Sequence, residues 1–531
     1  MTITLNGHDL TITDVYDIAR RNVPCTISED ARRNITRSRE QFEEIAASNI
    51  PIYGVTTGYG EMVYALVDKS QETQLQTNLV RSHSAGAGRY FPEQEARAIL
   101  VARLNALVRG YSAVRPELAD QLLAYLNSGV TPCIPEIGSL GASGDLGPLS
   151  HIASAVIGEG YVWKDGTPTP TAQVLAEAGL APLELKFKEG LALINGTSAM
   201  TGLGSLVAYD AHQQIRTAEI ITALVLEVLQ ASSSAFQPEG HDIARPHRGQ
   251  IDSAGNLRAL LEGSALVQTH RSLREEMDAQ RQGAEQDEVV VTDVYLQKAY
   301  TLRCIPQIVG AVRDTLYNTQ RTLGTELNSS NDNPLFFEGR EIFHGGNFHG
   351  QPVAFAMDYL AIALVQLGVV SERRTNRLLN RYLNNGMPEF LIHGDPGLKC
   401  GMAGLQYPAT ATVAENRSLC TPASIQSIPS NGDNQDVVSM GLIGTRKARQ
   451  ILDNNWIVLA VEAMAAVQAA RLADAAGKLG VAGSATLKAL GEQFAFLDED
   501  RYLSDDLYRM IDHLKSGALV DAIERAGVEL R

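Results

Sequence analysis

The segment Gly138–Gly147 (GSLGASGDLG) combines residue types that could build an electrophile from the backbone itself. If the backbone nitrogen of Gly144 attacks the carbonyl carbon of Ala142, a five-membered ring closes. Glycine at position 144 removes the side chain that would block this bend, and the flanking glycines tolerate strained dihedral angles. Loss of water from the ring and from Ser143 then leaves an exocyclic methylidene. The product, 4-methylidene-imidazol-5-one (MIO), is a Michael acceptor.

Two simpler interpretations of this glycine-rich segment remain open at this point. It could be a flexible turn, or a phosphate-binding loop at the N-terminus of a helix. The second fits poorly, because no GK[ST] sequence follows and no strand precedes it in a βαβ pattern. Asp145 could help with proton transfers during ring closure, or could simply be the N-cap of the following helix.

The elements that must position this segment are predicted to be helices. Three stretches are apolar around most of the helical wheel, which is typical of helices buried in a large bundle: Val207–Gln230, Ala354–Val370 and Asn454–Arg471. Strand-like alternation is limited to Thr2–Leu5 and Thr11–Ile12. Glycine-rich polar segments fall between the helices: Tyr53–Gly60, Gly138–Gly147, His344–Gly350 and Ser430–Asp436. We therefore expect an almost entirely helical protein with its chemistry in loops at helix ends.

Composition and charge exclude several classes of protein. The chain has 531 residues, 44% of them hydrophobic and 20% charged, and a net charge of −16, which argues against binding to nucleic acid. Charged or polar residues interrupt each long apolar stretch and disfavour a membrane span. The N-terminus lacks the pattern of a secretory signal. Five scattered cysteines without a CxxC pair indicate neither disulfides nor a zinc site. A reducing cytoplasm fits these cysteines best, and no metal or nucleotide is expected.

The run GSLGASGDLGPLSHIA (Gly138–Ala153) resembles the signature of the MIO family, which contains the histidine, phenylalanine and tyrosine ammonia lyases and the 2,3-aminomutases. Gly147 departs from the alanine usual there, but it lies outside the cyclising tripeptide. The resemblance extends over almost the whole chain. It includes YGVTTGYG (Tyr53–Gly60), NLVRSHSAG (Asn78–Gly86), EGLALINGTS (Glu189–Ser198), QKAYTLRCIPQ (Gln297–Gln307), NDNPLFF (Asn331–Phe337), GGNFHGQP (Gly345–Pro352), AENR (Ala414–Arg417) and NGDNQDVVSM (Asn431–Met440).

This resemblance implies a mainly α fold, with a long central helical bundle of the histidine/phenylalanine ammonia-lyase (aspartase-like) type and catalytic loops at helix ends. Along the chain we expect an MIO-bearing region with the Tyr53 loop over residues 1–200. A central long-helix bundle with substrate loops is expected over 201–480, and a C-terminal helical region over 481–531. These regions are expected to form one continuous structural unit. The resemblance also implies a homotetramer whose active sites are shared between subunits.

The resemblance also assigns roles to individual residues. Tyr53 is the expected base for the β-proton, although a phenol ordinarily ionises near pH ~10. Arg303 is the expected clamp for the substrate carboxylate, and Tyr300 shares its helical or turn face. The other expected substrate-binding residues are Gly60, His83, Asn195, Tyr295 and Tyr407. The residues expected to pack around or support MIO are Asp145, Asn347, Phe348, Glu415, Asn434 and Gln435. His344 and His349 make only a weak metal pair, which we reject.

His83 is the position most informative about the substrate. A ring nitrogen here could bind a para-hydroxyl group, and a site that binds a hydroxyl rejects analogues lacking it. Histidine lyases can also carry Ser-His at this point, but the NGDNQDVVSM run differs from theirs and favours tyrosine. A core histidine with its hydrogen bonds satisfied is the simpler alternative.

The runs QTNLVRSHSAG (Gln76–Gly86) and FHGQPVAFAMDY (Phe348–Tyr359) resemble bacterial 2,3-aminomutases of natural-product pathways. The expected activity therefore converts L-tyrosine to β-tyrosine through 4-coumarate, with some release of coumarate and ammonia. The alternatives are a tyrosine ammonia lyase, a histidine ammonia lyase and a catalytically dead helical scaffold.

Overall fold

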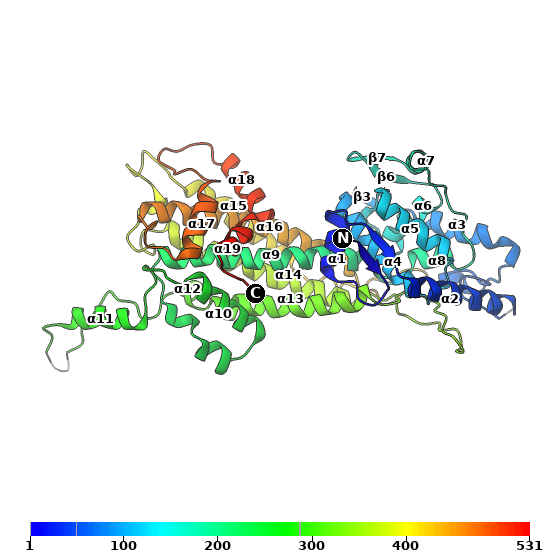
Figure 1. Ribbon diagram of the computed structural model, residues 1–531, viewed down its shortest axis with the longest axis horizontal. Helices are drawn as coiled ribbons and strands as arrows, with labels where there is room; N and C mark the ends of the chain where they lie inside the picture. Colours follow the sequence, from blue (N-terminus) through cyan, green and yellow to red (C-terminus); the bar gives the residue numbers. More distant parts are fainter. Residues whose placement is uncertain (1, 49, 286–287) are drawn as a thin grey trace. The chain divides into compact units, whose positions relative to one another are not determined.

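Helices make up most of the computed structural model, which describes residues 2–48, 50–285 and 288–531 (Figure 1). Contacts divide the chain into two compact units, each made of three segments. The first comprises Met1–Tyr209, Asn318–Tyr359 and Pro422–Ala448, and the second comprises Asp210–Tyr317, Leu360–Thr421 and Arg449–Arg531. The regions expected at 1–200, 201–480 and 481–531 do not coincide with these units. That they form one continuous structural unit stays a prediction.

The first unit contains short helices and all the strands of the described residues. Its helices are α1 (Ile12–Arg20), α2 (Glu29–Ala47), η1 (Gly60–Tyr64), η2 (Lys69–Gln71), α3 (Glu72–His83), α4 (Glu93–Val108), α5 (Pro116–Ser128), α6 (Leu146–Val156), α7 (Thr171–Glu177) and α8 (Glu189–Ile194). Its strands are β1 (Ile3–Leu5), β2 (Cys25–Ile27), β3 (Ala87–Tyr90), β4 (Thr131–Pro132), β5 (Pro135–Ile137), β6 (Tyr161–Lys164) and β7 (Thr167–Pro170).

The described residues of the second unit form helices and the loops between them, with no strand. Its helices are η3 (Ser233–Phe236), η4 (Glu239–Ile243), α10 (Arg248–Leu260), α11 (His270–Arg281), α12 (Tyr300–Arg303), η5 (Glu389–Leu391), α15 (Ala403–Leu419), α17 (Val481–Gly491), α18 (Ser504–Lys515) and α19 (Ala518–Arg525). Four long helices contribute residues to both units: α9 (Ser198–Val228), α13 (Ile305–Leu327), α14 (Gln351–Leu379) and α16 (Gly441–Leu472).

The three long apolar helices predicted from the sequence are confirmed as α9, α14 and α16. The first ends at Val228, slightly before the predicted Gln230. Helix α14 is the one described helix that is long and apolar enough to cross a membrane, and 72% of its most apolar stretch is buried inside the structure. Such burial is typical of a core helix.

The expected strand at Thr2–Leu5 is confirmed as β1, which pairs in parallel with β2. The alternation at Thr11–Ile12 is wrong as a strand signal, because Thr11 is the N-cap of α1. The Thr11 hydroxyl accepts from the Asp14 backbone N–H, and the Asp14 side chain accepts from the Thr11 backbone N–H. This capping box satisfies two backbone donors at the helix start, and so it favours the helix over an extended segment.

Three glutamates that interrupt the predicted apolar helices have partners within their own unit. Glu219 lies 2.6 Å from Arg313, and Glu462 lies 2.5 Å from Arg374, with all four side chains almost fully buried. Glu227 accepts a 2.7 Å hydrogen bond from the Gly480 backbone N–H. A buried charge without a partner is costly, so removing either partner of these pairs is expected to destabilise the second unit.

The part of the first unit that positions the site is a cluster of packed helices. Helix α3 packs against α6 and α8, and α6 packs against α8. Helix α6 begins at Leu146, within the end of the glycine-rich segment, and α8 ends at Ile194, directly before Asn195. The loops at the ends of these helices therefore meet in one region of the unit (Figure 1).

Candidate active site

The turn Ala142-Ser143-Gly144 lies against the segment that joins α8 to α9. Gly144 has a φ of +72° and forms a bridge with Gly196. A Cβ atom added to Gly144 would lie 2.0 Å from the carbonyl oxygen of Gly196, so no side chain fits there. The backbone N–H of Gly196 donates to the Ser143 carbonyl at 3.3 Å, and that of Asp145 donates to the Gly196 carbonyl at 2.7 Å. Glycine is thus required at position 144 by both conformation and space.

Ser143 is contacted by two polar side chains from distant parts of the sequence. The Gln435 Nε2 donates to the Ser143 Oγ at 3.0 Å, and the Asn195 Nδ2 donates to the Ser143 carbonyl oxygen at 3.4 Å. Asn195 is buried, and its Oδ1 has no hydrogen-bond partner in the structure. A buried acceptor without a partner is unfavourable unless a ligand or water supplies a donor.

Asp145 follows this turn but does not cap the helix that it precedes. It occupies the N-cap position of α6 and makes no side-chain capping bond there. Its carboxylate instead accepts from the Met200 backbone N–H at 2.9 Å and from the Ser139 hydroxyl at 2.7 Å. It therefore caps the start of α9, and the simple interpretation as N-cap of the following helix is wrong. The role in proton transfer stays a prediction.

The carboxyl group of Asp145 is fully buried beneath the turn. Burial raises its pKa to about 6, although hydrogen bonds from the Met200 backbone and the Ser139 hydroxyl oppose the shift. Arg103, also fully buried, donates to Asn331 Oδ1 at 3.1 Å and to the Ala192 carbonyl at 2.6 Å. These contacts tie α4 to α8 and to the segment that follows α13, which gives the turn a rigid support.

Tyr53 lies in the loop between α2 and η1 and lines the same cavity as Ser143. Its hydroxyl oxygen accepts a 2.8 Å hydrogen bond from the Gly60 backbone N–H. Burial raises the pKa of Tyr53, and the hydrogen bond from Gly60 opposes the shift. The Tyr59 ring lies edge-on to it, with ring centroids 6.2 Å apart, and the Tyr59 hydroxyl accepts from Gln76 at 2.8 Å. Gly60 is therefore a backbone donor that favours the ionised form of Tyr53.

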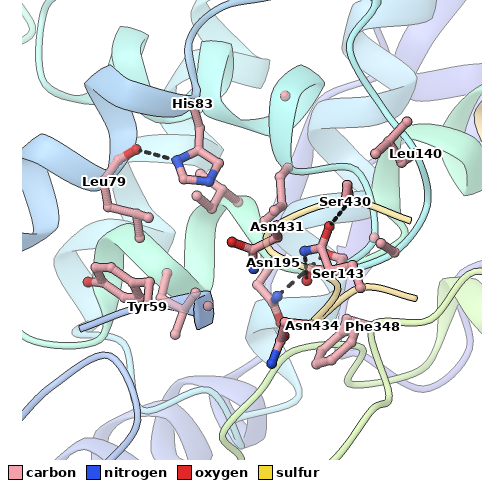
Figure 2. Close-up of a pocket in the computed structure, with 18 of the residues that line it drawn as sticks. Tyr59, Leu79, His83, Leu140, Ser143, Asn195, Phe348, Ser430, Asn431 and Asn434 are labelled. Carbon is pink, nitrogen blue, oxygen red and sulfur yellow. Dashed lines mark hydrogen bonds between the residues drawn. The ribbon is translucent and has the colours of Figure 1, made fainter. Parts of the chain in front are cut away.

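His83 is the last residue of α3, and its ring faces the cavity (Figure 2). Its Nδ1 lies 3.0 Å from the Leu79 carbonyl oxygen, which can only accept. The Ser82 Oγ also lies 3.0 Å from Nδ1. The Leu79 contact favours the neutral tautomer with the proton on Nδ1, and in that tautomer Nε2 carries a lone pair. A ring held in this way presents an acceptor suited to a phenolic O–H.

These side chains surround one cavity of about 610 Å³, a size typical of small-molecule sites. The apolar part of its lining (the apolar wall) is formed by Met62, Val63, Leu79, Leu140, Leu146, Leu191 and Ile194. Figure 2 shows Ser143, Asn195, Ser430 and Asn434 close together, with Leu140 beside Ser430 and with Leu79 and His83 on the other side of the view. The cavity can therefore hold an aromatic ring against the apolar wall and polar groups near Ser143.

Most of the residues expected in the site line this cavity: Tyr53, Gly60, His83, Ala142, Ser143, Gly144, Asn195, Phe348, Asn434 and Gln435. Asp145 lies beneath it. Asn347 is exposed beside Phe348 and does not line it. In the part of the chain that the structure describes, no group of three or more His, Cys, Asp or Glu side chains could hold a metal ion.

Five expected site residues belong to the second unit and do not line the cavity: Tyr295, Tyr300, Arg303, Tyr407 and Glu415. Tyr295, Tyr300 and Tyr407 are exposed. The Arg303 guanidinium lies 4.7 Å from the centre of the Tyr300 ring, which confirms that these two share a face. The cavity of a single chain thus lacks the arginine expected for the substrate carboxylate.

Several lining residues were missed from the sequence. Tyr59 lies in the YGVTTGYG run and Asn431 in the NGDNQDVVSM run, so the sequence did indicate the segments to which they belong. The sequence did not indicate the apolar lining residues, because Leu and Ile within amphipathic helices usually indicate only a core. Only packing shows that these side chains face a cavity.

Residues 10–492 match the family described as aromatic amino acid lyase, and the chain belongs to this family of enzymes. It is 58% identical to the MIO-dependent tyrosine 2,3-aminomutase of Streptomyces globisporus, over 100% of this chain and 98% of that protein. It is 57% identical to a tyrosine ammonia-lyase of Cupriavidus metallidurans, over 99% and 98% of the two chains. The crystal structure of the tyrosine aminomutase from Streptomyces globisporus matches it with a TM-score of 0.98, covering 100% of both chains. The family resemblance and the mainly helical fold are confirmed.

Proposed function

We propose that this protein is an MIO-dependent tyrosine 2,3-aminomutase that converts L-tyrosine to β-tyrosine through 4-coumarate, with ammonia-lyase side activity. The observation that carries the proposal is the 58% identity to an aminomutase of that name over the whole chain. The cavity supports it, since Tyr53, His83 and Ser143 all line it. We place the enzyme in the cytoplasm and in natural-product biosynthesis.

The residues around Ser143 fit an MIO group formed from Ala142-Ser143-Gly144 by autocatalytic ring closure. Gly144 has the left-handed backbone and the absence of side-chain space that the bent tripeptide needs. The buried Asn195 Oδ1 lacks a partner beside the turn. Asn195, Phe348 and Gln435 would surround the group, which supplies an electrophile for the substrate amine. No metal or nucleotide is part of this proposal.

The remaining groups bind the substrate and move its proton. His83 accepts the phenolic O–H of tyrosine at Nε2 and so orients the ring along the apolar wall. Tyr53, as phenolate, removes the β-proton, because this weakly acidic hydrogen needs a base close to it. The apolar side chains exclude water, which favours retention of the coumarate intermediate. A mutase outcome requires that retention.

A histidine-to-phenylalanine change at position 83 tests the selectivity. His83→Phe removes the acceptor for the phenol, so the preference in kcat/KM for tyrosine over phenylalanine is expected to fall by about 10²-fold or more. Steady-state kinetics on both substrates measures this ratio. His83→Gln keeps an acceptor and is expected to retain part of the preference. An unchanged ratio in His83→Phe would remove His83 from substrate recognition.

We further propose that the enzyme is a homotetramer in which Tyr295, Tyr300, Arg303, Tyr407 and Glu415 of one subunit complete the cavity of another. The cavity has no Lys or Arg among its described lining residues, whereas a carboxylate substrate calls for one. In the second unit, Arg303 lies over the ring of the exposed Tyr300, and its guanidinium could supply the cation for this carboxylate. A monomer by light scattering would contradict the assembly.

Subunit mixing tests the shared site directly. Tyr53→Phe and Arg303→Ala should each be nearly inactive alone. When they are co-expressed with different tags and the mixed oligomers are isolated, some cavities receive both intact residues, so activity is expected to return to a substantial fraction of the wild type. Mixtures of Tyr53→Phe with Tyr53→Phe carrying the second tag are the control. Absence of any recovery would place both residues in one chain's site.

Chiral product analysis after incubation with L-tyrosine tests the reaction itself. β-Tyrosine as a main product supports the mutase. Coumarate and ammonia alone would establish the second candidate, a tyrosine ammonia lyase, which the 57% identity to such an enzyme favours. Urocanate from histidine would indicate a histidine lyase. No turnover and no loss of two waters from the chain would indicate a dead scaffold.

A further inference from the structure

One short turn, Ser430–Gln435 (the 430–435 turn), contacts both Ser143 and the loop that carries Tyr53. At its end, Gln435 donates from Nε2 to the Ser143 Oγ at 3.0 Å. The Ser430 hydroxyl donates to the Gln435 Oε1 at 2.8 Å, and the two residues form a backbone bridge. Near its start, Asn431 reaches the loop that carries Tyr53. The turn therefore links the Ser143 side to the Tyr53 side.

The contact between Asn431 and Gly60 is unusually close. Gly60 has a φ of +56°, and a Cβ atom added to it would lie 2.3 Å from the Asn431 Nδ2 and 3.0 Å from its Cγ. The side-chain amide of Asn431 thus packs directly on the Gly60 Cα, in space that any other residue would fill. Asn431 itself has a φ of +53°, and its carbonyl accepts from the Asn434 backbone N–H at 3.2 Å. The turn holds this amide in place.

Gly60 is the residue whose backbone N–H donates to the Tyr53 hydroxyl oxygen at 2.8 Å. Such a bond is stronger to a phenolate than to a phenol, because the acceptor is then charged. Its strength depends on the distance and angle of the Gly60 amide. A group that presses on the Gly60 Cα therefore controls how well the ionised form of Tyr53 is stabilised.

We propose that Asn431 is a positioning residue for the base: it holds the Gly60 amide against the Tyr53 oxygen and thereby sets the fraction of Tyr53 that is phenolate. This inference rests on the proposed function, in which Tyr53 is the base. Two titratable side chains contact Tyr53: the Tyr59 ring lies edge-on to it, and the His344 Nε2 lies 3.4 Å from its backbone nitrogen. Glu61 lies beside Gly432 of the turn, Asp433 is on the turn itself, and His83 lines the same cavity. Burial lowers the pKa of His344, which keeps that ring neutral.

The test is Asn431→Gly, which removes the side chain and keeps the left-handed backbone accessible. With the amide gone, the Gly60 donor is less well held, so a smaller fraction of Tyr53 is ionised at any given pH. The base is active only when ionised, so the rising limb of kcat/KM against pH is expected to move to higher pH. At neutral pH kcat/KM falls about tenfold, and it recovers as the pH rises.

A matched control is Asn22→Gly, since Asn22 is also an exposed asparagine in the left-handed region, with a φ of +54°, and does not line the cavity. Its profile is expected to coincide with that of the wild type. An independent readout is the ultraviolet difference spectrum between each protein and its Tyr53→Phe derivative, recorded during a pH titration without substrate. In Asn431→Gly this phenol signal should appear at higher pH.

The outcomes separate the two proposals. If Tyr53→Phe is nearly inactive but the limb and the phenol titration of Asn431→Gly match those of Asn22→Gly, the inference about Asn431 is wrong and the base survives. If Tyr53→Phe keeps full activity, the assignment of the base itself fails. Loss of the two-water mass change in Asn431→Gly would also overturn the inference, because it would place the effect of Asn431 on the Ser143 side.

Discussion

Ser143→Ala is expected to yield a folded chain that does not lose two waters and turns over L-tyrosine at least about 10³-fold more slowly than the wild type. Without the serine hydroxyl there is no group to leave as the second water, so no methylidene forms. The substitution removes only the acceptor for Gln435 Nε2, which lies 3.0 Å from the Ser143 Oγ in a partly accessible cavity. The fold should therefore persist, as circular dichroism can check.

Intact-protein mass spectrometry and product analysis together measure the result. Ser128→Ala is the matched control, because its hydroxyl only donates to the Ala124 carbonyl at the exposed end of α5. That control should show the wild-type loss of two waters and wild-type turnover. A Ser143→Ala protein that kept substantial activity would defeat the proposed chemistry of the tripeptide.

Tyr53→Phe is expected to separate the base from the electrophile. The two-water mass loss should remain, because Tyr53 is not part of the turn, while kcat falls by about 10²- to 10⁴-fold, the usual contribution of a general base. The ring still fills its place against Tyr59, but the Gly60 N–H loses its acceptor. Substrate binding, measured with a non-reacting tyrosine analogue, should change much less than kcat.

Tyr161→Phe is a suitable comparison, since Tyr161 is an exposed tyrosine on β6 outside the cavity. It should match the wild type in mass and in rate. If Tyr53→Phe turned over tyrosine at the wild-type rate across the pH range, the base would have to be another group.

Much of the fold could be predicted from local sequence. The long helices α9, α14 and α16 follow from apolar residues around the whole helical wheel, a pattern that only burial in a bundle explains. The exception at Thr11–Ile12 is instructive. Two β-branched residues resemble a strand locally, but Thr11 and Asp14 form a capping box that begins α1.

The candidate site was predicted unevenly. Tyr53, His83, Ser143 and Gln435 were found because each lies in a distinctive run, and they do line one cavity. Asn431, three residues before Asn434, was missed, because its contact with Gly60 joins segments far apart in the chain. Arg303 was expected in the same site, yet it lies in the other unit.

Ala142-Ser143-Gly144 illustrates what the sequence by itself determined. The types and order of three adjacent residues are enough to specify a possible ring closure, because the reacting atoms are already neighbours along the backbone. The sequence also determined the periodic burial of the long helices, which is likewise a local property.

The tertiary structure decided the rest, for one physical reason: the contacts that matter join distant segments. The sequence allowed two roles for the carboxylate of Asp145. In the folded chain this carboxylate accepts from the backbone N–H of Met200 at the start of α9, where the first N–H groups have no partner within the helix. Packing also brings the Asn431 amide into contact with Gly60, and it brings the Gly60 backbone N–H within hydrogen-bond distance of the Tyr53 hydroxyl. Neither contact has a local signature, because the energy of each depends on distances that exist only after the chain has folded.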